Sequence, residues 1–173
     1  MLRRATEVEL ITHEHRFTAK VYTHGQRLLD MLNDRTTDYL KITDAEVHRY
    51  SDPEKSIAVF PTAIIRKEDL HLAIIPGEDH EAPTQRLFGY VQKSPYHVFL
   101  TVPGYEVRGV MYLTIQREPD PIHVLESHAR KFFAVTGATA SQAWTGEDVL
   151  SCPVVMVNKD SLSLFYVGED RVK

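Results

Sequence analysis

Ile64-Ile65-Arg66-Lys67-Glu68-Asp69-Leu70 occurs a second time in this chain, in related form, 92 residues later as Met156-Val157-Asn158-Lys159-Asp160-Ser161-Leu162. Both versions place apolar residues before a short polar connector that contains a lysine, and a leucine after it. The match extends outward, because residues 8–75 are echoed by residues 97–167 in the type, order and spacing of their residues. Self-similarity of this kind predicts an internal duplication.

The two copies align with only two small changes of length. The shift between equivalent residues is 89 at the start of the copies, 93 in the middle and 92 at the end. Two duplicated units that pack on each other form a pseudo-twofold object with one seam, and a site can lie at that seam. The aligned pairs include Thr12 with Thr101, Val21 with Val110, Thr43 with Thr136, and Pro61 with Pro153.

The repeat predicts a first unit at residues 1–76, a polar linker or bridging segment at 77–95, and a second unit at 96–173. A domain of about 60 residues buries only about 60% of its unfolded surface, so either unit alone would be marginally stable. A fused pair buries a larger fraction. The duplication therefore has a reason in stability that is independent of function.

Composition indicates a folded soluble protein, because 43% of the residues are hydrophobic and 25% are charged. The net charge of −4 argues against a general binder of nucleic-acid phosphates, which would be basic.

The single cysteine, Cys152, excludes an internal disulfide, and its first-copy equivalent Phe60 marks a core position. The start of the chain lacks the apolar core of a secretion signal. We expect a cytoplasmic protein.

Period-2 patterning predicts a strand hairpin at the start of each copy, turning at Glu14-His15 in the first and at Pro103-Gly104 in the second. Short helices are predicted at residues 26–33 and 121–130. Long strands follow at 39–47 and 132–140, and the equivalent residues Asp44 and Gly137 are types that tolerate a kink or bulge. Buried hydroxyls on the shared Thr43 and Thr136 would need a backbone carbonyl as partner.

Two further strands close each copy, at residues 57–66 and 70–75 and at 149–157 and 162–167. A polar turn is predicted at 51–55, and the short connectors at 67–69 and 158–161 have the chemistry of hairpin turns. Short, bent strands close into small barrels to remove their edges. The expected fold is therefore mainly β with short helices: two five-stranded barrel-like units, each with one helix, packed with pseudo-twofold symmetry.

The closing strands and their basic turn resemble the last two strands of Sm-like proteins and, more generally, of SH3-type small β-barrels. The chain departs from the Sm-like pattern because its helix follows two strands and because the usual turn glycine is missing. The unit also resembles a tandem-repeat bacterial domain of unknown function, which implies a fold and no activity. The Sm-like resemblance implies a nucleic-acid or ring-forming role for the turn residues Arg66, Lys67, Asn158 and Lys159. The competing interpretation is a soluble, hydrogen-bonded turn, because no aromatic residue that would stack on a base lies beside these residues.

The nine histidines suggest a metal site as a further alternative. His13 and His15 would share one face of a regular strand, and His24 or His48 could supply another ligand. The second copy has Val102 and Gly104 instead. Surface histidines are the competing interpretation.

No nucleophile elbow, phosphate-binding glycine loop or dinucleotide motif occurs in the sequence, so we expect no catalytic residues and no cofactor. The interpretation that we favour is a non-enzymatic binding or assembly module that recognises a protein partner or small ligand at the seam. It would not bind membranes, and it could form a homo-oligomer. Aromatic residues dominate interface hot spots. The candidate anchors are Tyr50, Tyr90, Tyr96 and Trp144.

Overall fold

The computed structural model describes residues 5–77, 93–114, 118–147 and 150–169. We refer to residues 5–77 as the first half and to residues 93–169 as the second half. The first half contains β1 (Ala5–Ile11), β2 (His15–Tyr22), α1 (Leu28–Asn33), β3 (Tyr39–Arg49), β4 (Asp52–Arg66), the 3-10 turn η1 (Lys67–Asp69) and β5 (Leu72–Ile75). The second half contains β6 (Ser94–Val102), β7 (Tyr105–Leu113), α2 (Pro121–His123) continued by η2 (Val124–His128), β8 (Phe132–Gln142), β9 (Leu150–Asn158), η3 (Lys159–Ser161) and β10 (Leu164–Gly168).

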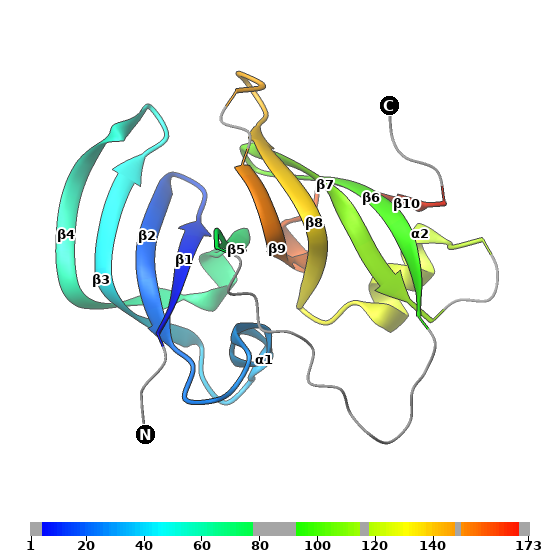
Figure 1. Ribbon diagram of the computed structural model, residues 1–173, viewed down its shortest axis with the longest axis horizontal. Coiled ribbons are helices and arrows are strands. Elements are labelled where there is room, and N and C mark those ends of the chain that lie inside the picture. Colours follow the sequence, from blue (N-terminus) through cyan, green and yellow to red (C-terminus); the bar gives the residue numbers. More distant parts are fainter. Residues whose placement is uncertain (1–4, 78–92, 115–117, 148–149, 170–173) are drawn as a thin grey trace.

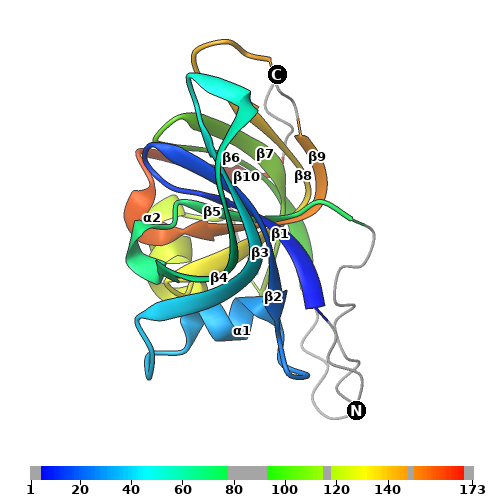
Figure 2. The ribbon, with the colours of Figure 1, turned by 90° about the vertical axis from the view of Figure 1, so that its left-hand side faces the viewer.

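The ten strands form one open antiparallel sheet in the order β10-β6-β7-β8-β9-β5-β1-β2-β3-β4. The prediction of a mainly β chain with short helices is therefore confirmed. Figure 1 shows two lobes side by side, with the strands of the first half at the left and those of the second half at the right. Figure 2 looks onto β3 and β4 at the left end of the sheet, where both strands are long and curved.

The halves join where β5 pairs with β9, in the register Leu72 opposite Val157 through Ile75 opposite Val154. The other edge of β5 pairs with β1. All four residues of β5 are buried. Side chains of a strand point alternately to its two faces. Leu72 and Ile74 belong to the core of the second half, whereas Ala73 and Ile75 belong to the core of the first half. We call the contact region between the halves the seam.

The connectors before β5 and β10 are not hairpin turns, which corrects the prediction. Residues 67–69 and 159–161 form single 3-10 turns, and the strand after each turn does not return along the strand before it. Instead, β5 pairs with β1 and β9, and β10 pairs with β6. The predicted turn at 51–55 is also too long, because β4 begins at Asp52.

The middle strands carry the predicted irregularities. The β2–β3 ladder shifts register between Thr18 and Lys20, and the β7–β8 ladder shifts between Arg108 and Val110. Asp44 and Gly137 lie opposite these bulges and have positive φ values of 48° and 51°. The two threonine hydroxyls donate to backbone carbonyls across the ladder, from Thr43 to Lys20 at 3.3 Å and from Thr136 to Val110 at 3.1 Å. Both predictions are confirmed.

The strand pairing corrects the predicted alignment shift at the start of the two similar segments. Lys20 lies opposite Thr43, and Val110 occupies the corresponding place opposite Thr136. Lys20 therefore corresponds to Val110, which gives a shift of 90 instead of 89. A one-residue change matters because it moves every side chain of a strand to the other face.

Most of the predicted linker, residues 78–92, lies outside the described residues, and so does Tyr90. None of the helices described is long and apolar enough to cross a bilayer.

Candidate functional site: the seam between the halves

Asn158, the last residue of β9, bonds across the seam at one end of the β5–β9 pairing. Its side chain is completely buried, and its Nδ2 donates to the carbonyl of Leu70 at 2.8 Å. Its backbone N–H donates to the carbonyl of His71 at 3.0 Å, while its Oδ1 accepts from the N–H of Asp160 at 3.0 Å. A buried amide with these partners fixes the position of one half against the other.

A histidine pair lies beside this junction. His71 connects η1 to β5, and its Nδ1 lies 2.7 Å from the Ser161 hydroxyl of the second half. Its ring meets the ring of His13 edge-on, at a centroid distance of 6.1 Å. Burial lowers the pKa of His71 below 6.5, and the nearby His13 lowers it further. The neutral form of His71 therefore predominates at neutral pH. Its Nδ1 shares a hydrogen bond with the Ser161 hydroxyl across the seam.

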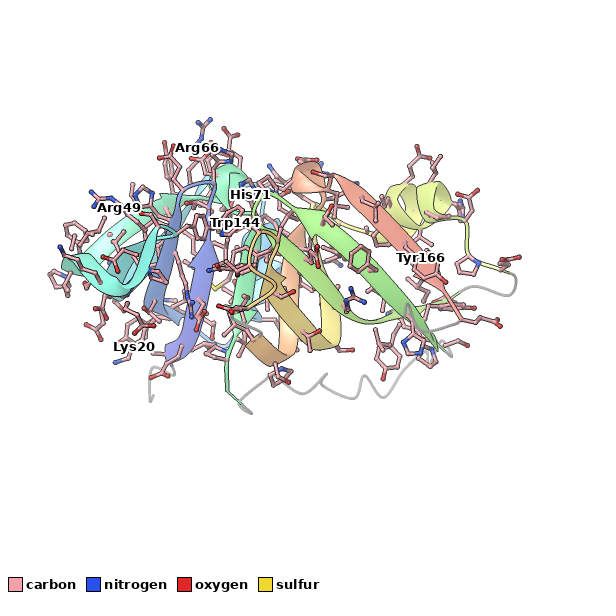
Figure 3. The ribbon with its side chains drawn as sticks, turned by 90° about the horizontal axis from the view of Figure 1, so that it is seen from above. Lys20, Arg49, Arg66, His71, Trp144 and Tyr166 are labelled. Carbon is pink, nitrogen blue, oxygen red and sulfur yellow. The ribbon has the colours of Figure 1, made fainter. Side chains whose placement is uncertain are left out.

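An aromatic cluster lies on the outer surface of the seam. Tyr50, in the turn between β3 and β4, packs against Trp144 and against Tyr105, each at a centroid distance of 5.9 Å. The Tyr50 hydroxyl donates to the carbonyl of Thr12 at 2.6 Å, and burial raises the pKa of this phenol. Trp144 remains 60% exposed. In Figure 3, seen from above, Trp144 and His71 lie over the middle of the molecule, whereas Arg49 and Tyr166 lie toward opposite ends.

A hollow of about 340 Å³ lies next to Tyr50 and opens to solvent. The turns β1–β2 and β3–β4 form it, and it contains both charged and aromatic groups. Its lining residues are His13, Glu14, His15, Arg49, Tyr50 and Ser51.

Of the three predicted anchors that the structure describes, two come together. Tyr50 and Trp144 come from different halves and meet at the seam. Tyr96, in β6, is 6% exposed and belongs to the core of the second half, so it is not available as a surface anchor. Tyr90 falls outside the described residues.

The two equivalent turn lysines use their ammonium groups inside the molecule. Lys67 is 6% exposed, and its Nζ donates to the Asp34 carbonyl at 3.0 Å and to the Thr37 hydroxyl at 2.9 Å. Lys159 donates to the carbonyls of Leu125 and Ala129 at 3.3 and 3.5 Å. Lys67 therefore ties down the segment after α1, and Lys159 ties down the end of η2 in its own half. Arg66 pairs with Glu68. These contacts favour the interpretation of a hydrogen-bonded turn over that of an RNA-binding turn.

The N-terminal histidines contact different neighbours, because the ring of His15 lies against Phe17 while that of His13 lies against His71. Across the described ranges, no three His, Cys, Asp or Glu side chains are close enough together to hold a metal ion. Cys152 is 4% exposed, and burial raises the pKa of its thiol to about 11. The predicted core position of Cys152 is confirmed.

Sequence reasoning missed the polar residues that join the halves. Asn33, His71, Asn158 and Ser161 all bond across the seam. A signal was present, because these are positions where the two aligned segments of the sequence differ in chemistry. Asn158 corresponds to Arg66, and His71 corresponds to Ser163. The side chains of Asn158 and His71 each have a partner in the other half, and the residues aligned with them differ in type.

No family model, curated protein or solved structure matches this chain. The geometry of the seam therefore carries the functional argument by itself.

Proposed function

We propose that this chain is a non-enzymatic binding module that takes a segment of a partner protein at the seam, with Trp144 and Tyr50 as anchors. The observation that carries the proposal is the exposed indole of Trp144 packed edge-on against a fixed tyrosine. Tryptophan and tyrosine dominate interface hot spots. Tyr50 is held by its hydrogen bond to Thr12 and by Tyr105 behind it. A fixed anchor loses little conformational entropy when it is covered.

The neighbouring hollow extends this surface. Its volume of about 340 Å³ is at the lower end of the range for small-molecule sites, and it is open instead of enclosing. Glu14 and Arg49 supply one acidic and one basic group on its wall. An open, mixed surface beside an exposed tryptophan suits a peptide segment better than a fully enclosed small ligand, which is the alternative.

We further infer that the seam arose when one small unit of five strands and a helix was duplicated, giving two barrel-like units joined head to tail, because β5 of the first half pairs with β9, the counterpart of β4, in the second half. The same order of elements occurs in both halves. The equivalent bulges, the positive φ at Asp44 and Gly137, and the two threonine-to-carbonyl bonds support the inference, because such irregular features seldom coincide by chance.

A photo-crosslinking experiment tests the binding surface. A photoreactive phenylalanine replaces Trp144 in the source cells, and the same residue at Tyr112 serves as the control, because Tyr112 is 55% exposed on β7 away from the seam. We expect one protein to be crosslinked from position 144 and not from position 112. The same set of products from both positions would contradict the proposal.

The purified partner then allows a direct measurement. Trp144 is the only tryptophan, so its emission reports the seam alone. We expect a blue shift on addition of the partner, and at least about tenfold weaker binding for Tyr50→Ala, as for the loss of a hot spot. Unchanged affinity in both Tyr50→Ala and Trp144→Ala would contradict the assignment of the anchors.

A further inference from the structure

The two ends of the sheet carry exposed apolar side chains. Among the described strands, β4 and β10 are the ones that pair on one side only. On β4, Val59 is 69%, Phe60 45% and Ile64 64% exposed. On β10, Leu164 is 49% and Tyr166 36% exposed. Unpaired strand edges with apolar side chains are templates for pairing with another chain.

The β5–β9 pairing at the seam is an internal example of the contact that the two edge strands, β10 and β4, would make between molecules. With the shift of 92 residues, β10 corresponds to β5 and β4 corresponds to β9, and β5 pairs with β9 inside the chain. The internal counterparts of the exposed residues are covered. Leu72 and Ile74, which correspond to Leu164 and Tyr166, are completely buried, and Met156 and Cys152, which correspond to Ile64 and Phe60, are each 4% exposed.

We propose that β10 of one chain pairs antiparallel with β4 of a second copy, so that chains assemble head to tail and repeat the β5–β9 junction between molecules. The internal register transfers directly to the new contact. It places Leu164 opposite Ile65, Phe165 opposite Ile64, Tyr166 opposite Ala63, and Val167 opposite Thr62. This assembly is separate from partner binding at the seam, because it uses the two ends of the sheet (Figure 1).

The prolines of the two copies agree with this register. Proline has no N–H to donate and is excluded from the centre of a ladder. Pro153 lies one residue before Val154, where the β5–β9 pairing begins. Pro61 lies one residue before Thr62, in the same position relative to the proposed pairing. The proline of β4 therefore limits the length of the junction without blocking it.

Exposed apolar side chains near the β4 and β10 edges would also cover each other in the assembly. Tyr39 is 52% exposed at the start of β3, whereas its counterpart Phe132 is completely buried beneath α1 of the other half. In the assembly, α2 would take the place of α1 and cover Tyr39 with Ile122, which is 69% exposed.

Charges match at the same junction. Asn158 reaches the backbone carbonyl of Glu68 at 3.4 Å across the seam. The corresponding residues at the open ends are Arg66 and Asp160, so the Arg66 side chain would reach toward the backbone of Asp160, whose side chain has the opposite charge. The two ends differ in sequence and shape, so their contact is head to tail and gives either a ring or a growing chain.

The first test is the molar mass of the full chain in solution, measured by light scattering after size-exclusion chromatography. We expect a mass of at least twice the 19.8 kDa of one chain. Ile64→Lys and Tyr166→Lys should each reduce it to a monomer, because a lysine on an edge strand opposes pairing. Tyr112→Lys is the matched control and should keep the wild-type mass. Circular dichroism is used to check that each variant is folded, which we expect because the replaced side chains are exposed.

A cysteine pair tests the register. Ala63→Cys and Tyr166→Cys in one chain would lie opposite each other between neighbouring molecules, within disulfide range. Oxidation should give a ladder of linked chains, or one covalent ring, on a non-reducing gel. Val59→Cys with Tyr166→Cys is out of register and should not be linked. The proposal is overturned by a monomeric wild type at all concentrations, by an oligomer that both lysine variants leave intact, or by equal linking of the two cysteine pairs.

Discussion

Asn33 bonds to the main chain of Phe132 as a neighbouring strand would. Its Oδ1 accepts from the Phe132 N–H at 2.9 Å, and its Nδ2 donates to the Phe132 carbonyl at 2.9 Å. Asn33 ends helix α1 of the first half, and Phe132 begins β8 of the second half. The Phe132 side chain is completely buried in the core of the first half. One amide thus joins the halves beside the β5–β9 pairing.

Asn33→Ala should lower the free energy of unfolding by about 2 kcal/mol, because it leaves two backbone groups at a buried residue without this partner. Chemical denaturation of both proteins measures the difference. Asp30→Ala is the control on the same helix. It removes an ion pair to Arg130 that also crosses between the halves but is exposed, and it should cost less than about 0.5 kcal/mol. An equal loss of unfolding free energy in the two variants would show that the Asn33 bonds contribute no more to stability than the exposed ion pair does.

His71 should titrate below its ordinary pKa of 6.5 in the folded protein, because burial and His13 disfavour its charged form. At a pH between the lowered pKa of the folded protein and the ordinary pKa of 6.5, the unfolded chain binds more protons than the folded chain does. The free energy of unfolding therefore falls as the pH falls through 6.5. NMR of the imidazole gives the midpoint directly. The free energy of unfolding of His71→Gln should decline less steeply over this range than that of the wild type. A midpoint at or above 6.5 would contradict the buried, neutral imidazole at the seam.

Gly137→Ala should destabilise the protein by about 1 kcal/mol, because Gly137 has φ of 51° and a Cβ there would meet no neighbouring atom within 4 Å. The cost is thus one of backbone conformation. Gly137→Asp should cost less than Gly137→Ala, since Asp44 adopts the same conformation in the other half and aspartate tolerates it better than alanine does. Denaturation curves give the order of the two variants, and the reverse order would be inconsistent with the proposed equivalence of these positions.

Cys152 should be unreactive in the native protein at pH 8, because its buried thiol has a pKa of about 11 and forms little thiolate. Labelling with a thiol reagent should become fast only in denaturant. Rapid stoichiometric labelling of the folded chain would contradict the core position of Cys152.

Charge reversal tests the proposed contact between molecules. Arg66→Glu should weaken assembly by placing an acidic side chain against Asp160 of the next copy, as should Asp160→Arg against Arg66. The double variant restores opposite charges and should recover the wild-type mass in part. The measurement is the concentration dependence of molar mass. A double variant that assembles no better than either single variant would show that these two residues do not meet.

The sequence was most informative where local chemistry determines local structure. Pro103-Gly104 marks a real hairpin, and the bulges at Asp44 and Gly137 follow from the residue types at those positions. The two short helices and the middle strands also begin close to where the patterns place them.

Pairing between distant strands was beyond local patterns. Lys67-Glu68-Asp69 has the composition of a hairpin turn, yet it forms a 3-10 turn that directs β5 to β1 and β9. Nothing in these three residues specifies which strand β5 meets. The meeting of Tyr50 with Trp144 is similar, because it depends on how two halves pack and not on spacing along the chain. The polar bonds of the seam, such as those of Asn158, require that packing to be known first.

The most direct test of the two joined halves is the pattern of cross-strand nuclear Overhauser effects from β5. If β5 belongs to the seam, its amide and α protons should give cross-peaks to β9, with Leu72 near Val157 and Ile75 near Val154, as well as to β1. Cross-peaks from β5 to β4 instead, as in an ordinary hairpin across residues 67–69, would contradict the single sheet and with it the seam.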